Sequence, residues 1–418
     1  MLRSKNRDSK MPPTGNISAG HSRQNGRRLL ALGFCALALA ATSCATAEKK
    51  PSVQITGNLL IDGPNAIANG PARDKVLWQY RTALAYMRRG DFAQSKTILD
   101  DALLRIGSVF GNDDSAKKSR GYFRKEAKKT FIGEPYERSM AYIYRGMLYW
   151  RDGEPDNARA CFRSAQLADS DTEEKVYSGD WVLADYLDGL ASAKLGGDGS
   201  DALKRAQASA KGITLPPYNT RANVLVFIEF GPGPGKTATG EYAEELRITT
   251  APSPVKSVQL TFDTFTIPAA PTDDVGFQAT TRGGRVMDHI LGRKAVFKSA
   301  TDVAGNVALI GGLGTALVSH DRTTQEVGLG IALAGVISKV VSAATMPDAD
   351  IRAWDNLPQY LTFMNLQLSP GRHTLTATYL SPSGSPIPNL TKQISFDVAA
   401  GKDKVLFISD QSSTPLNL

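Results

Sequence analysis

The sequence contains few of the residues from which metal and nucleophilic sites are most often built. Among its 418 residues there are three cysteines and four histidines. The three histidines that follow residue 43 lie in different segments without metal-type spacing: His289, His320 and His373. Neither an H-E-x-x-H helix nor a G-x-S-x-G turn is present in the sequence. We therefore expect no catalytic residues, no metal site and no cofactor, and we interpret the chain as a non-enzymatic protein.

Apolar runs long enough to form a membrane-spanning helix are also missing. Such a helix requires roughly 20 apolar residues. One shorter apolar run, 29–44, follows a segment rich in lysine and arginine and ends in Ala-Ala-Thr-Ser-Cys. This order is typical of an export signal, and small residues before a cysteine are typical of a lipobox. We predict a lipoprotein signal peptide over residues 1–43 and a palmitate-type lipid on Cys44. A plain signal peptide, with Cys44 incidental, is the alternative.

Lipidation of Cys44 would also set the location of the protein. Ala45 follows the cysteine, and lipoproteins without aspartate at that position are usually sorted to the outer membrane. We therefore expect a protein that is anchored by its lipid to the cell outer membrane and faces the periplasm. With Cys35 inside the signal, Cys161 has no partner for a disulfide, and its place beside Phe162 indicates a packed thiol.

The positive net charge belongs mostly to the leader. The whole chain carries a formal charge of +8, and residues 1–43 hold seven lysines and arginines against one aspartate. The remaining residues are therefore close to neutral. A basic chain can indicate nucleic-acid binding, but this charge distribution does not, and we expect no nucleic-acid partner.

Residues 230–237, FGPGPGKT, resemble a phosphate-binding P-loop. The motif requires a glycine at position 230, which is Phe230, and backbone N–H groups that Pro232 and Pro234 do not have. We therefore predict a tight loop between strands and no bound nucleotide.

The pattern of apolar residues divides the rest of the chain into four parts. Residues 44–72 are small and polar and predict a flexible tether. Residues 73–212 have helical periodicity, whereas residues 213–410 contain strand-like runs interrupted by a helical insert at 283–345. Residues 411–418 would form a tail. The expected fold class is α+β, with a tetratricopeptide-like helical array followed by a β-sandwich-like domain.

The helical part contains small and aromatic residues at the offsets of tetratricopeptide repeats. Alignment on Gly153 places further residues at the expected offsets: Gly146, Tyr149, Ala158, Phe162 and Ala165. Alignments on Gly90 and Gly196 give weaker matches, and the spacing of the three glycines is irregular. A generic antiparallel helical bundle is the alternative. Grooves of such arrays bind partner proteins, and we take Tyr86, Tyr149 and Trp150 as candidate partner-binding residues.

Residues 303–344 contain two glycine-rich apolar segments around a polar turn. Small residues recur every fourth position, which allows two helices to pack closely. Three interpretations stay open: a hairpin packed on the β-domain, an oligomer-forming element, and a hairpin that inserts into the membrane.

Three stretches together carry a family resemblance: residues 133–162, 282–294 and 348–375. The last contains D-x-R-x-W-x-x-L-P, beginning at Asp350, followed by a P-G-x-H turn. The chain resembles an uncharacterised family of bacterial envelope lipoproteins with tetratricopeptide-like helices at the N-terminus. The resemblance implies an envelope role without a defined activity. Arg352 and Trp354 are either partner-binding residues or structural ones, with Arg352 paired to Asp350 or Asp355.

Together these features favour a membrane-anchored scaffold that binds other envelope proteins through the helical groove. Two alternatives remain: an oligomeric secretion or pore component that uses the glycine-rich hairpin, and a glycan-binding or glycan-modifying factor. The partner and the oligomeric state do not follow from the sequence.

Overall fold

The computed structural model describes residues 55–109, 129–171, 175–263, 265–281, 349–412 and 416–417. All of them belong to one compact unit, Val53–Leu418. The predicted signal peptide, the lipidated Cys44 and the helical insert at 283–345 lie outside the described residues. None of the helices in the described part is long and apolar enough to cross a membrane.

Eight α-helices and three sheets form the described part, so the chain has an α+β fold. The helices predicted between residues 73 and 212 are confirmed. In chain order the α-helices are α2 (Leu59–Asn69), α3 (Lys75–Arg89), α4 (Phe92–Val109), α6 (Pro135–Arg151), α7 (Pro155–Asp169), α8 (Val182–Lys194), α9 (Ser200–Ser209) and α10 (Val275–Thr280). Consecutive helices of this series pack against each other from α2 to α4 and from α6 to α9.

Helix α2 corrects the prediction that the whole of residues 44–72 is a flexible tether. Asn58 caps the helix by accepting a hydrogen bond from the Leu60 backbone. The buried Asp62 carboxylate accepts hydrogen bonds from the backbone N–H groups of Thr56 and Gly57. Gly63 lies so close to Thr82 of α3 that a Cβ would be 1.9 Å from the hydroxyl oxygen. The glycine that indicated flexibility is therefore a site of close helix packing.

The described part contains eleven strands. They are β1 (Val224–Pro232), β2 (Gly235–Thr239), β3 (Glu245–Thr249), β4 (Ser257–Phe262), β5 (Phe265–Ala269), β6 (Asp273–Asp274), β7 (Pro358–Leu366), β8 (Gly371–Leu380), β9 (Lys392–Val398), β10 (Lys404–Ser409) and β11 (Leu416–Asn417). Those predicted from apolar runs, β1, β3, β4 and β7 to β10, are confirmed, whereas β2, β5, β6 and β11 were not predicted. Strand β11 corrects the predicted tail, because it pairs in parallel with β9.

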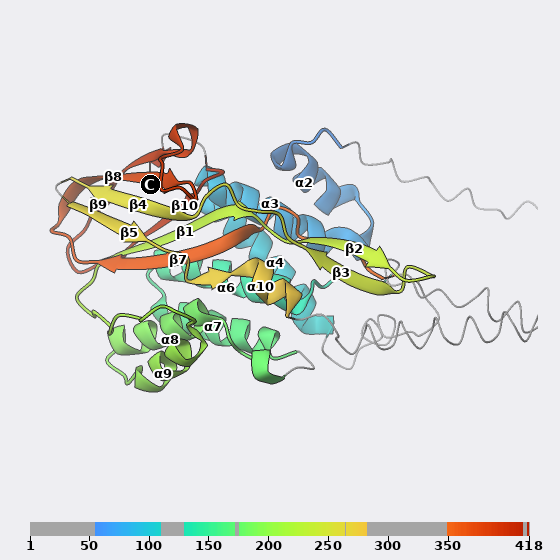
Figure 1. The fold of residues 1–418 in the computed structure, drawn as a ribbon, viewed down its shortest axis with the longest axis horizontal. Helices are drawn as coiled ribbons and strands as arrows, with labels where there is room; N and C mark the ends of the chain where they lie inside the picture. The colour runs from blue at the N-terminus through green and yellow to red at the C-terminus, as the bar shows by residue number, and fades with distance from the viewer. Residues whose placement is uncertain are drawn as a thin grey trace, which may run out of the picture. The chain divides into compact units, whose positions relative to one another are not determined.

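The sheet β10-β1-β7-β6 is buried on both faces. Side chains of a strand alternate between faces, and in β1 Leu225 and Phe227 join the core shared with the helices. Val226 and Ile228 join a second core, shared with the sheet β11-β9-β8-β4-β5. This explains why β1 is apolar at almost every position. Figure 1 shows β1 running beside β7, with the helices α6 to α9 on one side of this sheet.

Residues 230–237 continue as strands where a P-loop would begin a helix. Strand β1 ends at Pro232, and β2 begins at Gly235 and pairs with β3. The connection between the two strands is short, as predicted. Lys236, the residue at the position of a P-loop lysine, is buried in an ion pair with Glu137 of α6.

Candidate functional site

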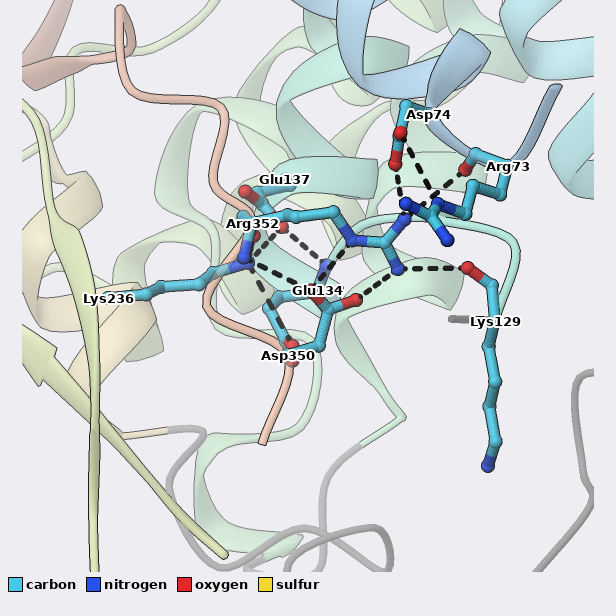
Figure 2. A network of polar contacts seen from close by, with 8 residues as sticks. All are labelled: Arg73, Asp74, Lys129, Glu134, Glu137, Lys236, Asp350 and Arg352. Carbon is cyan, nitrogen blue, oxygen red and sulfur yellow. Dashed lines mark hydrogen bonds and ion pairs between the residues drawn. The ribbon is translucent and has the colours of Figure 1, made fainter. Parts of the chain in front are cut away.

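Glu137 is the centre of a buried polar junction that includes two of the predicted residues. It lies in the first turn of α6, where its side chain accepts a hydrogen bond from the Glu134 backbone at 2.6 Å. Its Oε2 atom is also 2.6 Å from the ammonium of Lys236 in β2, and Oε1 accepts a hydrogen bond from the Trp354 backbone. Figure 2 shows this carboxylate among charged residues from distant parts of the chain.

Arg352 forms the second half of the junction. Its guanidinium contacts Asp350 at 2.6 Å and Asp74 at 2.7 Å, and it donates a hydrogen bond to the carbonyl oxygen of Lys129 (Figure 2). The expected pairing with Asp350 is confirmed. Asp355, the other expected partner, pairs with Arg81 of α3 instead. Arg352 therefore ties the segment before β7 to the start of α3.

Trp354 lies inside the helix–sheet core, with 1% of its surface exposed. Its ring stacks on Tyr80 of α3 at a centroid distance of 4.5 Å and lies 5.9 Å from the ring of Tyr144 in α6. In this conformation the indole contributes to packing and presents no surface to a partner. The junction as a whole joins α3, α6, β2 and the segment before β7. Because its charges are paired with one another, the arrangement indicates a role in holding these segments together.

Trp150 and Tyr149, at the end of α6, have different surroundings. Trp150 is buried, and its indole N–H donates to Asp403 at 2.8 Å. Tyr149 is half-buried, with the guanidinium of Arg145 3.3 Å from its ring centroid. Tyr86, the remaining predicted partner-binding residue, is half-buried in α3. Of the aromatic residues predicted to bind a partner, only the two tyrosines keep an exposed portion.

A cavity of about 790 Å³ lies beside Trp150, and sequence reasoning did not predict it. It forms where the ends of α6 and α8 meet the residues before β1 and the turn between β9 and β10. The lining residues are Trp150, Arg151, Asp152, Gly153, Pro155, Lys194, Thr220, Arg221, Ala222, Asn223, Gly401, Lys402 and Asp403. They come from four separate segments, and none of these segments carries a motif that could have indicated the cavity.

A second buried polar cluster joins α3, α6 and β1. Arg88 of α3 donates a hydrogen bond from Nε to Glu229 at 2.5 Å, and the hydroxyl of Tyr144 donates to the other carboxylate oxygen. Burial and the Glu229 charge hold the pKa of Tyr144 well above its ordinary value. Glu229 is the acidic residue within the apolar run of β1, and an acid in such a run is the feature of the sequence that could have indicated this cluster. Its groups are buried and paired, which indicates a structural role.

Asp273 of β6 is a buried acid at the start of α8. Its carboxylate oxygens accept hydrogen bonds from the backbone N–H groups of Val182 at 2.9 Å and Leu183 at 2.8 Å. These N–H groups have no partner within the helix, and the helix N-terminus favours negative charge. Burial nevertheless raises the pKa of Asp273 to about 7.

Cys161 is the remaining candidate nucleophile of the sequence. Cys161 of α7 is buried, and burial raises the pKa of its thiol to about 11. Within the described ranges, no group of three or more histidine, cysteine, aspartate or glutamate residues is placed to hold a metal ion. Comparisons with known proteins returned no match among family models, curated proteins or solved structures.

Proposed function

We propose that the chain is a lipid-anchored protein of the bacterial cell envelope that serves as a protein-interaction scaffold and has no enzymatic activity. The leader sequence and Cys44 support the membrane anchor and the outer-membrane location, facing the periplasm. The pairing of the buried charges around Glu137 and Glu229 supports a structural rather than a catalytic role for these clusters.

We also propose that the helices form a tetratricopeptide-like array and that the two larger sheets form a β-sandwich-like domain. The three aligned glycines, Gly90, Gly153 and Gly196, support the array, because all follow the first helix of a hairpin with positive φ. Only glycine adopts this conformation without strain. Close packing of Gly146 against Phe162 also supports it, since a Cβ on Gly146 would lie 2.6 Å from the ring.

The groove expected from such an array is not open in this fold. The first helices of the hairpins, α3 and α6, pack against β10, and α8 is capped by Asp273 of β6. Residues of α6 are buried from Pro135 to Tyr144 with the exception of Tyr142. The sheet of the chain itself therefore covers the inner side of the helices, and a partner would need another surface.

The observation that best supports the scaffold proposal is a partly exposed aromatic strip on α6, formed by the residues that the sheet does not cover. Tyr142 and Tyr149 are two helical turns apart and both are half-buried. Between them, Arg145 pairs with Asp100 of α4 at 2.6 Å and lies over the Tyr149 ring. Arg145 is buried, so the two tyrosines supply the accessible surface. Tyrosine is enriched where proteins bind one another. We propose that partner proteins dock on this tyrosine strip.

In-cell photocrosslinking tests the scaffold proposal. A benzophenone amino acid at Tyr149 or Tyr142 should form one and the same adduct with an envelope protein, identified by mass spectrometry. The same amino acid at Phe265, an exposed aromatic on β5, is the matched control and should not form that adduct. Replacement of Tyr142 by Asp should remove the adduct at Tyr149, because the strip would lose its aromatic surface. Equal adducts at Tyr149 and Phe265, or none at Tyr149, would contradict the proposal.

One alternative function has an observation in its favour. The cavity beside Trp150 has several cationic residues in its lining, which suits a glycan-binding role with an acidic ligand. The proposal of a secretion or pore component depends on the glycine-rich hairpin, which lies outside the described residues.

A further inference from the structure

The cavity beside Trp150 is large enough for a small ligand and is lined mainly by polar residues. Its volume of about 790 Å³ lies within the range of roughly 300–1,000 Å³ that is usual for small-molecule sites. Apart from Trp150, Pro155 and Ala222, the lining consists of polar or charged residues and glycines. Such walls suit a hydrophilic ligand better than an acyl chain.

The acids of the lining are already neutralised by neighbouring donors. Asp403 accepts a hydrogen bond from the Trp150 indole at 2.8 Å and pairs with Lys194, also at 2.8 Å. Asp152 pairs with Lys96 of α4 at 2.5 Å. Asp403 is therefore compensated, and Asp152 has only a longer contact of 3.8 Å with one further cation of the cavity, Arg151.

Three cations of the lining retain unused hydrogen-bonding groups. Arg221 and Lys402 are exposed, and within the described part of the chain no acceptor is bonded to either side chain. Arg151 is 40% exposed, and its closest approach to the Asp152 carboxylate is 3.8 Å. The pKa of the nearby Lys404 is lowered by burial and by the positive charge of Arg151, which agrees with a positive potential at this end of the sheet.

We propose that this cavity binds a compact ligand that carries phosphate or carboxylate groups, such as a phosphorylated or acidic sugar, through Arg151, Arg221 and Lys402. The three cations come from the end of α6, the segment before β1 and the turn before β10, and all three line the same cavity. Guanidinium groups donate paired hydrogen bonds to phosphate and carboxylate oxygens. The site does not depend on the proposed scaffold role, because it lies in different residues from the tyrosine strip.

Calorimetric titration of the purified full-length chain tests this site. The probes are inorganic pyrophosphate, digalacturonate, and vesicles containing phosphatidylglycerol, all at low ionic strength. We expect saturable binding of a soluble probe and a loss of affinity of about tenfold or more in the R221Q/K402Q variant, because charge-assisted hydrogen bonds are removed. The R221K variant should lose less affinity than R221Q/K402Q, since it keeps the charge although not the paired donors of a guanidinium.

The matched control is the R247Q/K256Q variant, which removes one arginine and one lysine that are exposed on β3 and just before β4. It should bind like the wild type. Preference for pyrophosphate or for digalacturonate identifies the ligand as a phosphate or a carboxylate, and either result supports the site. Binding to vesicles alone would overturn the proposal in favour of a membrane surface. Equal affinity of the wild type and R221Q/K402Q, or no binding of any probe, would also overturn it.

Discussion

Glu137 and Lys236 form an ion pair in the protein interior, with 2.6 Å between the carboxylate oxygen and the ammonium and almost no exposure of either side chain. Glu137 lies in the first turn of α6, whereas Lys236 lies in β2. The pair therefore connects a helix and a strand that are about a hundred residues apart, and it does so within the junction that also holds the Trp354 backbone.

The K236M substitution should lower the free energy of unfolding by about 3–5 kcal/mol, because it leaves the Glu137 carboxylate buried without its counter-charge. The double substitution K236M/E137Q should be more stable than K236M, since glutamine is neutral and can still accept the Trp354 N–H. Urea unfolding measures both values. K256M, which changes an exposed lysine, is the control and should stay within about 0.5 kcal/mol of the wild type. A K236M protein as stable as this control would contradict the prediction.

Gly146 and Gly107 should respond in opposite directions to replacement by alanine. A Cβ on Gly146 would lie 2.6 Å from the Phe162 ring. A Cβ on Gly107 of α4 would meet no atom of the described residues within 4 Å outside its own stretch of helix. We expect G146A to cost about 1–3 kcal/mol through overpacking. We expect G107A to stabilise the protein by up to about 1 kcal/mol through helix propensity. Thermal and urea unfolding would test the pair, and a G146A protein of unchanged stability would rule out the close approach of α6 and α7.

The buried Asp273 should make stability depend on pH between about 4 and 7. Burial, with a smaller contribution from Asp180 and Asp169, raises its folded pKa to about 7 from its ordinary value of 3.8. In this range the folded chain holds a proton that the unfolded chain releases. The stability from this group is therefore greatest below pH 3.8 and declines as the pH rises to about 7.

The measurement is the free energy of unfolding of the wild type and of the D273N variant at a series of pH values. Other groups titrate in both proteins, so the difference between the two isolates Asp273. Wild-type stability relative to D273N should fall from pH 4 to about 7 and level off above it. A difference that does not change with pH would show that Asp273 is charged throughout.

The thiol of Cys161 should react slowly with thiol reagents in the folded protein. It is buried and its pKa is raised to about 11, so little thiolate is present at neutral pH. The experiment uses the C35S/C44S variant, in which Cys161 is the only cysteine, and follows the release of thionitrobenzoate with and without urea. Complete reaction in urea and slow reaction without it are expected. Rapid reaction of the folded chain would mean that the thiol is accessible.

The C44A substitution should abolish labelling of the protein by a palmitate analogue in cells, because the lipobox cysteine is the proposed attachment point. C35A is the matched control, since Cys35 lies inside the predicted signal, and it should be labelled normally. Labelling that persists in C44A would refute the lipid anchor.

The elements that were predicted well are those with local signals. Apolar residues at helical spacing predicted the helices between 73 and 212, and alternation predicted strands such as β8 and β9. Both periodicities follow from backbone geometry within a few residues. The prediction failed where one residue type is compatible with two kinds of structure. Gly63 and Pro64 suggested a flexible tether, but Gly63 allows α2 to pack closely on Thr82 of α3.

In the candidate site too, contacts between neighbouring residues could be predicted, whereas contacts between distant segments could not. From the sequence, Arg352 and Trp354 could belong to a surface or to the interior, and the pairing with Asp350, two residues away, was expected because it is local. Asp74, Lys129 and Tyr80 lie far away in the chain, so their contacts with this segment could not be predicted.

The sequence by itself determined most of the helices and strands and their order, but not α2 or β11. It also determined the neutral balance of the chain after residue 43 and the absence of a recognisable catalytic motif. The tertiary structure alone decided that the sheet covers the inner face of the helices, that Glu137 and Lys236 meet, and that Arg151, Arg221 and Lys402 surround one cavity. The physical reason is that periodicity is a property of neighbouring residues. Burial and charge pairing depend on which distant segments the packing of the layers brings together.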